Sequence, residues 1–218
     1  MSISAGILAL VASVSTQANE RYIDCVSLVD ADIELGRTAA QQWALEGGGA
    51  DAQHCLALAD IAAGFAKLGA ARLEDTAQRK DAGDDYVRAR LFSQAADAWL
   101  QADQVDLADK AIKSAFELAP EAAELNLTAA KIYAAKEDWL QVIASVQAAA
   151  KGGFISSDAF VLSARAYFTL GDYESAATDV ISALTIAPTN LDALVLRGEI
   201  QQTGVVIDVY VESPAGGK

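Results

Sequence analysis

The single histidine and the two cysteines are the residues of this chain best suited to reaction or metal chemistry. His54 stands directly before Cys55, and Cys25 lies 30 residues upstream. Adjacent residues on a helix point about 100° apart, so His54 and Cys55 do not form a catalytic dyad by themselves, and a metal site needs further ligands that converge from elsewhere. We interpret His54 as a surface histidine beside a structural cysteine, and we expect no catalytic residue, no metal and no cofactor.

The sequence also contains no motif for phosphate binding or for catalysis by a pair of carboxylates. The run Gly47-Gly48-Gly49 is not followed by the Lys and Ser/Thr of a phosphate-binding loop. The chain contains 30 Asp and Glu residues against 16 Lys and Arg, and no pair of carboxylates stands out from this acidic background. The sequence therefore predicts a protein that is not an enzyme.

The net charge of -14 restricts the class of partner. Nucleic-acid binding needs Lys and Arg to neutralise phosphates, and anionic lipid surfaces also attract basic segments. We expect no nucleic-acid partner. An acidic balance serves solubility, and it is also compatible with a basic protein partner.

The elements that carry these residues are predicted to be helices. Three prolines in 218 residues argue against a loop-rich chain. Within residues 157–190 the apolar side chains recur at helical spacing in two stripes, which Gly171-Asp172 separates and Pro188 ends. Further helices are expected at about residues 20–29, 32–46, 51–64, 66–80 and 191–203.

The 157–190 unit recurs at intervals of 34 residues. Ala164 aligns with Ala130, Ala96 and Gly198, while Tyr167 aligns with Tyr133 and Trp99. A fixed period in which small and aromatic positions coincide indicates a repeat architecture. In these positions, in the turn glycine and in the closing proline, the chain resembles the tetratricopeptide repeat (TPR) family.

The resemblance implies an all-α fold. This fold is an α-solenoid of antiparallel helix pairs that forms a right-handed superhelix, with about five pairs and a terminal half repeat. It also implies a concave groove that binds proteins, and no catalysis. The expected domains are a signal peptide at 1–18, a TPR-like repeat domain at 19–204 with its clearest repeats at 89–122, 123–156 and 157–190, and an irregular tail at 205–218. The first two pairs fit loosely, because Glu74 and Asp81 stand where the family has small residues.

Residues 1–18 carry no charge and are typical of a secretory signal peptide. Their apolar core, residues 6–14, is too short to span a bilayer, although no Lys or Arg precedes it. The sequence therefore predicts a periplasmic or secreted protein that is not inserted in a membrane once the signal is cleaved. The alternative is an apolar helix that docks on the first repeat of a cytoplasmic adaptor.

Cys25 and Cys55 are the only cysteines. Each lies near the start of the first helix of a pair, and such helices are neighbours in an array of this kind. A disulfide between them is feasible in an oxidising compartment. Two buried free thiols are the alternative.

The family frame also implies which residues face the groove. The predicted groove residues are Arg90, Asp97, Gln101, Lys131, Asp158, Val161, Arg165, Phe168 and Glu199. Four of them, at 97, 131, 165 and 199, occupy one equivalent position. They form either a ladder of ion pairs between adjacent helices or, at Lys131 and Arg165, a basic spot that holds a carboxylate. The family's lysine clamp for C-terminal carboxylates is not reproduced, because Ser93 and Leu127 stand in its place.

The array stops half-way through a unit, after Gly204. Either the terminus is simply mobile, or the uncapped face of Leu194 and Val195, or residues 205–211, pairs with another chain. The function expected from the sequence is a non-catalytic scaffold that binds a protein or peptide in the periplasm. The alternative is an architectural, self-associating component of an envelope complex.

Overall fold

The computed structural model describes residues 20–207, and these form eleven helices. Residues 20–31 are the first helix. The others are α2 (Ile33–Leu45), α3 (Gly49–Ala62), α4 (Ala66–Ala77), α5 (Asp85–Gln101), α6 (Val105–Leu118), α7 (Leu125–Ala135), α8 (Trp139–Lys151), α9 (Ser157–Thr169), α10 (Tyr173–Ile186) and α11 (Leu191–Gln202). The predicted signal peptide, and the predicted tail from residue 208 onward, lie outside the described residues.

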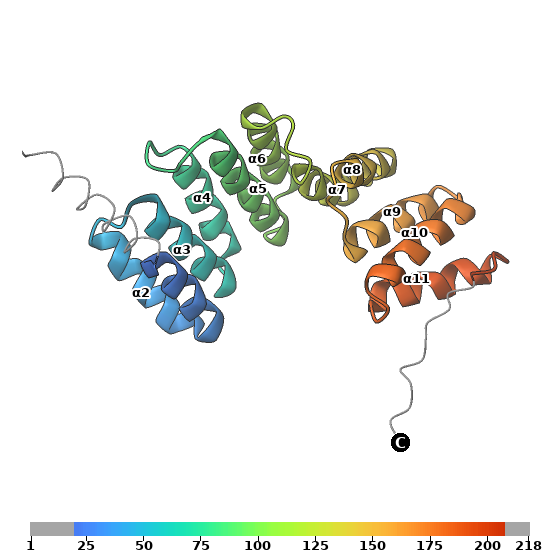
Figure 1. Cartoon of the computed structure of the whole chain (residues 1–218), viewed down its shortest axis with the longest axis horizontal. Coiled ribbons are helices and arrows are strands. Elements are labelled where there is room, and N and C mark those ends of the chain that lie inside the picture. Colours follow the sequence, from blue (N-terminus) through green and yellow to red (C-terminus); the bar gives the residue numbers. More distant parts are fainter. Residues whose placement is uncertain (1–19, 208–218) are drawn as a thin grey trace, which may run out of the picture. The chain divides into compact units, whose positions relative to one another are not determined.

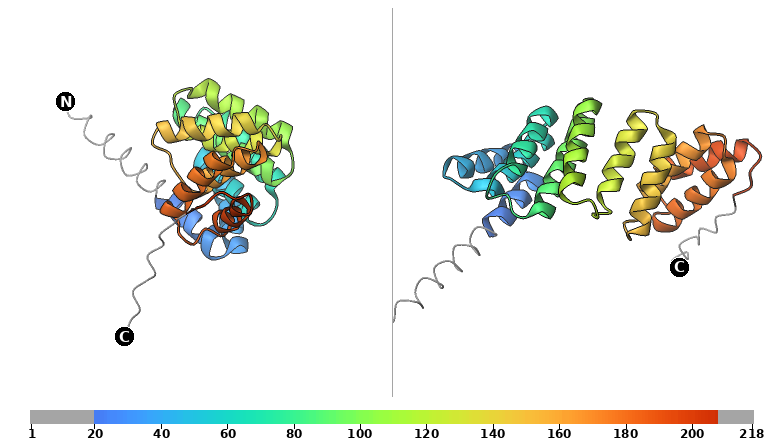
Figure 2. Two further views of the ribbon diagram at one scale, coloured as in Figure 1. Left: turned by 90° about the vertical axis from the view of Figure 1, so that its right-hand side faces the viewer. Right: turned by 90° about the horizontal axis from the view of Figure 1, so that it is seen from above.

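These helices fall into two compact units that divide after Pro120. The first unit holds the 20–31 helix and α2 to α6, and the second holds α7 to α11 (Figure 1). Within each unit, consecutive helices pack against one another in antiparallel order, as the two views of Figure 2 show. In the second unit α9 also contacts α7 and α11. Over residues 20–207, five pairs and the unpaired α11 confirm the predicted all-α, TPR-like architecture.

Polar residues at the helix starts explain where most helices begin. Ser156, for example, accepts a hydrogen bond at its hydroxyl from the Ala159 N–H at 3.1 Å, which satisfies one of the free amides of the first turn. The N-cap of α3, Gly48, has no side chain to do this. Asp81 does it from the loop after α4, because its Oδ2 accepts from the Ala50 N–H at 3.1 Å.

Small residues let the helices approach closely. Ala96, Ala130 and Ala164, which align in the repeat, are all buried. Gly48 shows how tight the packing is, because a Cβ added there would lie 2.3 Å from Trp43 Nε1. The high alanine content therefore serves helix packing at short distance.

The two acidic residues that depart from the family pattern are both hydrogen-bonded. Trp99 Nε1 donates to Glu74 Oε1 at 3.1 Å. Asp81 binds the α3 start and also accepts from Arg79 Nε at 2.8 Å. The helices of the first two pairs follow the same sequential packing as the others.

A disulfide joins the first helix to α3. The sulfur atoms of Cys25 and Cys55 lie 1.99 Å apart, and their Cα atoms 6.3 Å apart. Trp43, Leu56 and Val29 pack around this bridge in one apolar cluster. The structure thus pairs the two cysteines for which the sequence makes a disulfide feasible.

Candidate peptide-binding site

A pocket of about 300 Å³ opens between α7 and α9 in the second unit. Its lining residues are Leu127, Ala130, Lys131, Ser156, Asp158, Ala159 and Leu162. All of them lie on, or directly before, first helices of pairs, and two of them, Lys131 and Asp158, are predicted groove residues. The pocket therefore lies on the helix faces where the family resemblance places the groove.

The floor of this pocket is apolar because small side chains meet there. Ala130 and Ala159 are buried and form one cluster with Val146 of α8, against which Leu127 and Leu162 pack. Larger residues in place of the two alanines would fill the space above them. A concave apolar floor with a few polar groups at its edge is the usual composition of a ligand site.

Asp158 is exposed at the edge of the pocket and is held in place there. Asn190 Nδ2 donates to Asp158 Oδ1 at 2.8 Å and to Ser157 Oγ at 2.9 Å. The Ser157 hydroxyl in turn donates to the Ala183 carbonyl at 3.0 Å. Asn190 also accepts from the Ala193 N–H at 3.0 Å and so caps α11. The carboxylate is thus oriented by the amide of the residue that caps α11.

Arg165 is part of an internal ion pair. Its guanidinium donates to Glu199 of α11 and lies over the Phe168 ring, 5.9 Å from the centroid. Both charged side chains are about two-fifths exposed, at 40% and 38%, so the pair contributes only about 0 to 1 kcal/mol. This pair is a rung of the ladder that the 34-residue spacing predicts.

The remaining predicted groove residues are distributed over both units. Arg90, Asp97 and Gln101 lie on α5 of the first unit, where Arg90 and Gln101 are exposed. Val161 and Phe168 are partly buried and pack against the core of the last three helices. Their role in binding stays a prediction.

His54 is not a surface residue, which corrects the interpretation from sequence. It is half-buried and stacks on Tyr22 with ring centroids 5.7 Å apart. Its Nε2 lies 2.6 Å from Gln94 Oε1, and its Nδ1 lies 2.8 Å from the Tyr22 hydroxyl. Because an amide oxygen only accepts, Nε2 donates and Nδ1 accepts from Tyr22. Burial lowers the pKa of His54 below its usual 6.5, and burial also raises the pKa of Tyr22.

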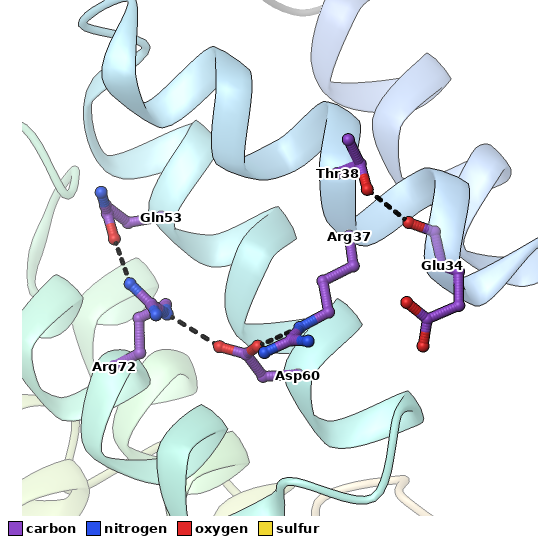
Figure 3. A network of polar contacts seen from close by, with 6 residues as sticks. All are labelled: Glu34, Arg37, Thr38, Gln53, Asp60 and Arg72. Atoms are coloured by element: carbon purple, nitrogen blue, oxygen red, sulfur yellow. Dashed lines mark hydrogen bonds and ion pairs between the residues drawn. The ribbon is translucent and has the colours of Figure 1, made fainter.

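A buried carboxylate in the first unit was missed from the sequence. Asp60 of α3 is 1% exposed and accepts from Arg37 Nε of α2 at 2.8 Å and from Arg72 Nε of α4 at 3.1 Å (Figure 3). Arg72 also donates to Gln53 Oε1 at 3.0 Å. The network links three helices, and a buried charge of this kind is tolerated only when it is paired and hydrogen-bonded. An Asp that directly follows Ala59 on a largely apolar helix was the signal that could have revealed it.

Within residues 20–207 no helix is both long and apolar enough to cross a lipid bilayer. In the same residues, no group of three or more His, Cys, Asp or Glu side chains is placed to hold a metal ion.

Solved structures show which fold this is. No family model and no curated protein matches the sequence. The structure is similar to TTC0263, a thermophilic TPR protein of Thermus thermophilus, with a TM-score of 0.63 and 17% identity over 85% of this chain and 99% of that one. YrrB, described as a TPR protein with an unusual peptide-binding site, gives a TM-score of 0.59 and 17% identity over 85% and 97%. A chain of the APC/C hetero-tetramer Cut9–Hcn1 gives 0.68 and 13% over 87% and 40%.

The fold is therefore the TPR fold, as the 34-residue period predicts. Repeats of this kind stack to form extended concave binding surfaces. Proteins with this fold are typically scaffolds for proteins or peptides and are generally non-catalytic.

Proposed function

We propose that this protein is a non-catalytic scaffold that binds an extended peptide segment of a partner protein in the α7–α9 pocket. The observation that carries the proposal is the pocket itself. It combines an apolar lining, to which Leu127, Ala130 and Leu162 contribute, with a charged edge. Such a combination suits one apolar anchor side chain and the polar groups of the peptide around it.

The compartment is a second part of the proposal. We propose a periplasmic protein, and the disulfide between Cys25 and Cys55 supports this, since disulfides persist mainly in oxidising compartments. Thiol labelling in native extract, with and without reductant, tests it. Labelling of both cysteines without reductant would contradict the periplasmic location.

A polar substitution in the pocket wall tests the binding site. A displayed library of 12-residue random peptides is selected on the full chain, and enriched peptides are titrated by fluorescence anisotropy. Leu127→Gln gives a side chain of comparable size but makes the wall polar, so we expect binding at least about tenfold weaker, as for loss of an apolar anchor contact. The matched control is Leu140→Gln on α8, which makes the same change at a side chain that is 68% exposed and outside the pocket. Equal binding by both variants would place the site elsewhere.

Self-association is a second candidate function, and one observation favours it. Val195 on α11 is 59% exposed, and Leu191 on the same helix is 76% exposed. Leu194, which is predicted from the sequence to share an uncapped face with Val195, instead packs against the core of α9 to α11. Leu191→Asn combined with Val195→Asn tests this by light scattering. A dimer that becomes a monomer supports self-association, and a mass unchanged from that of the wild type contradicts it.

A further inference from the structure

We propose that the α7–α9 pocket selects a segment in which a basic residue, Lys or Arg, adjoins the apolar side chain that enters the pocket. Asp158 is the residue that recognises the basic group, and Asn190 is its positioning residue. This inference rests on the proposed function and adds the chemical class of the ligand.

The carboxylate of Asp158 is already oriented by hydrogen bonds before any ligand binds. Asn190 Nδ2 holds one of its oxygens at 2.8 Å, and the same nitrogen is anchored on Ser157 Oγ. Ser157 is buried and is itself bonded to the Ala183 carbonyl. A carboxylate that is already oriented loses less conformational freedom when it binds a cation. A Lys or Arg at its open side would make a charge-assisted hydrogen bond.

The pocket next to Asp158 takes an uncharged side chain. The volume of about 300 Å³ and the lining by Leu127, Leu162 and Ala130 suit one large aliphatic or aromatic group.

The position of Asp158 determines where the basic residue of the ligand binds. Asp158 lies at the start of α9, so a basic residue is favoured there. Lys131, on the α7 side of the pocket, already takes part in an interaction within the protein. The net charge of the whole chain, -14, also attracts a basic segment over a longer range.

A library selection on matched variants tests this preference. The same 12-residue library is selected on the wild type, Asp158→Asn and Asn190→Ser. Asp158→Asn removes the charge but keeps an oxygen for Asn190. Asn190→Ser keeps a good cap for α11 but removes the amide that holds Asp158. The control is Glu174→Gln, which removes a charge from the exposed start of α10, outside the pocket.

The wild type is expected to enrich Lys or Arg beside an apolar residue. Peptides enriched in this way should bind Asp158→Asn about tenfold more weakly, as loss of one charge-assisted hydrogen bond implies, and Asn190→Ser by a smaller factor. Glu174→Gln should match the wild type. Raising the NaCl concentration should weaken binding to the wild type more than to Asp158→Asn.

Three results overturn the inference. In the first, the wild type enriches neutral or acidic peptides whose binding still depends on Leu127. This result would refute the proposed ligand class and leave the peptide-binding function intact. Another is a lower melting temperature of Asp158→Asn with unchanged peptide selection, because that outcome fits a role of Asp158 in stabilising the first turn of α9. Absence of any enriched peptide refutes the binding function itself, and this inference with it.

Discussion

The two units of this protein share one fold but use their polar residues differently. In the first unit, polar side chains bind one another across helices, as Asp60 does with Arg37 and Arg72, and as His54 does with Tyr22 and Gln94. In the second unit, Asp158 is held at the edge of an open apolar pocket. Both units have open pockets, of about 300 and 360 Å³ in the first and about 300 Å³ in the second. The difference lies in the carboxylate, because Asp60 is buried between two arginines whereas Asp158 is exposed at the edge of its pocket.

The largest effect is expected from the buried carboxylate of the first unit. Asp60→Ala leaves two arginines without their partner, so unfolding of the first unit should be easier by about 3 to 5 kcal/mol. Urea unfolding, followed by hydrogen exchange resolved for each unit, measures this. A change below about 1 kcal/mol would show that the network is energetically equivalent to an exposed ion pair. Peptide binding to the second unit is the control, and it should change little.

Removal of the disulfide is expected to have the second-largest effect on the free energy of unfolding. Replacing both Cys25 and Cys55 by Ala removes a cross-link over 30 residues, which is expected to cost roughly 3 to 4 kcal/mol in the chain-entropy model. Hydrogen exchange should rise mainly in the 20–31 helix and α3. Uniform loss of protection in both units would contradict a local role for the bridge.

Acidification should lower the free energy of unfolding of the first unit. Burial lowers the pKa of His54 in the folded state, so the unfolded chain binds more protons just below pH 6.5. The stabilisation is complete above pH 6.5 and is lost as the pH falls from there through the folded-state pKa. His54→Gln should remove this dependence, and an unchanged pH profile in that variant would assign it to another group.

The second unit should respond to acid with the opposite sign. Burial raises the pKa of Asp179 on α10, and a hydrogen bond with Ser163 partly offsets this. The folded state therefore binds more protons between pH 3.8 and the raised pKa, so stability falls as the pH rises through that window. Asp179→Asn should raise the melting temperature slightly at neutral pH. A lower melting temperature would show that the charged carboxylate is stabilising there.

The smallest effect is expected at the exposed pair between Arg165 and Glu199. Glu199→Gln should change the free energy of unfolding by no more than about 1 kcal/mol. A double-mutant cycle with Arg165→Met isolates the pair. A larger coupling would mean that this rung is as important as the buried network of the first unit.

The helices were predictable from sequence because they depend on local spacing. The 34-residue period predicts helix pairs between 89 and 190, and α6 to α10 lie within that range, whereas α5 begins earlier, at Asp85; α11 follows as a single helix. The predicted start of α3 at residue 51 was two residues late, since the helix begins at Gly49. Its first turn is capped by Asp81, which is distant in sequence. Local signals cannot reveal such a cap.

The site was predictable only in part. Lys131 and Asp158 follow from the repeat frame, and both line the pocket. The pocket itself exists because Ala130 and Ala159 leave space between two helices, which depends on packing. The Asp60 network was also missed, because its arginines lie 23 residues before it and 12 residues after it and meet only in the folded chain.

The most direct test of the proposed binding site is the titration of one library-selected peptide against Leu127→Gln and Leu140→Gln. The two variants carry the same substitution in the same unit, and only the first alters the pocket between α7 and α9. At least tenfold weaker binding by Leu127→Gln, with Leu140→Gln equal to the wild type, is the expected result for an anchor contact. Equal affinity of all three proteins would contradict the claim that the second unit binds its ligand in this pocket.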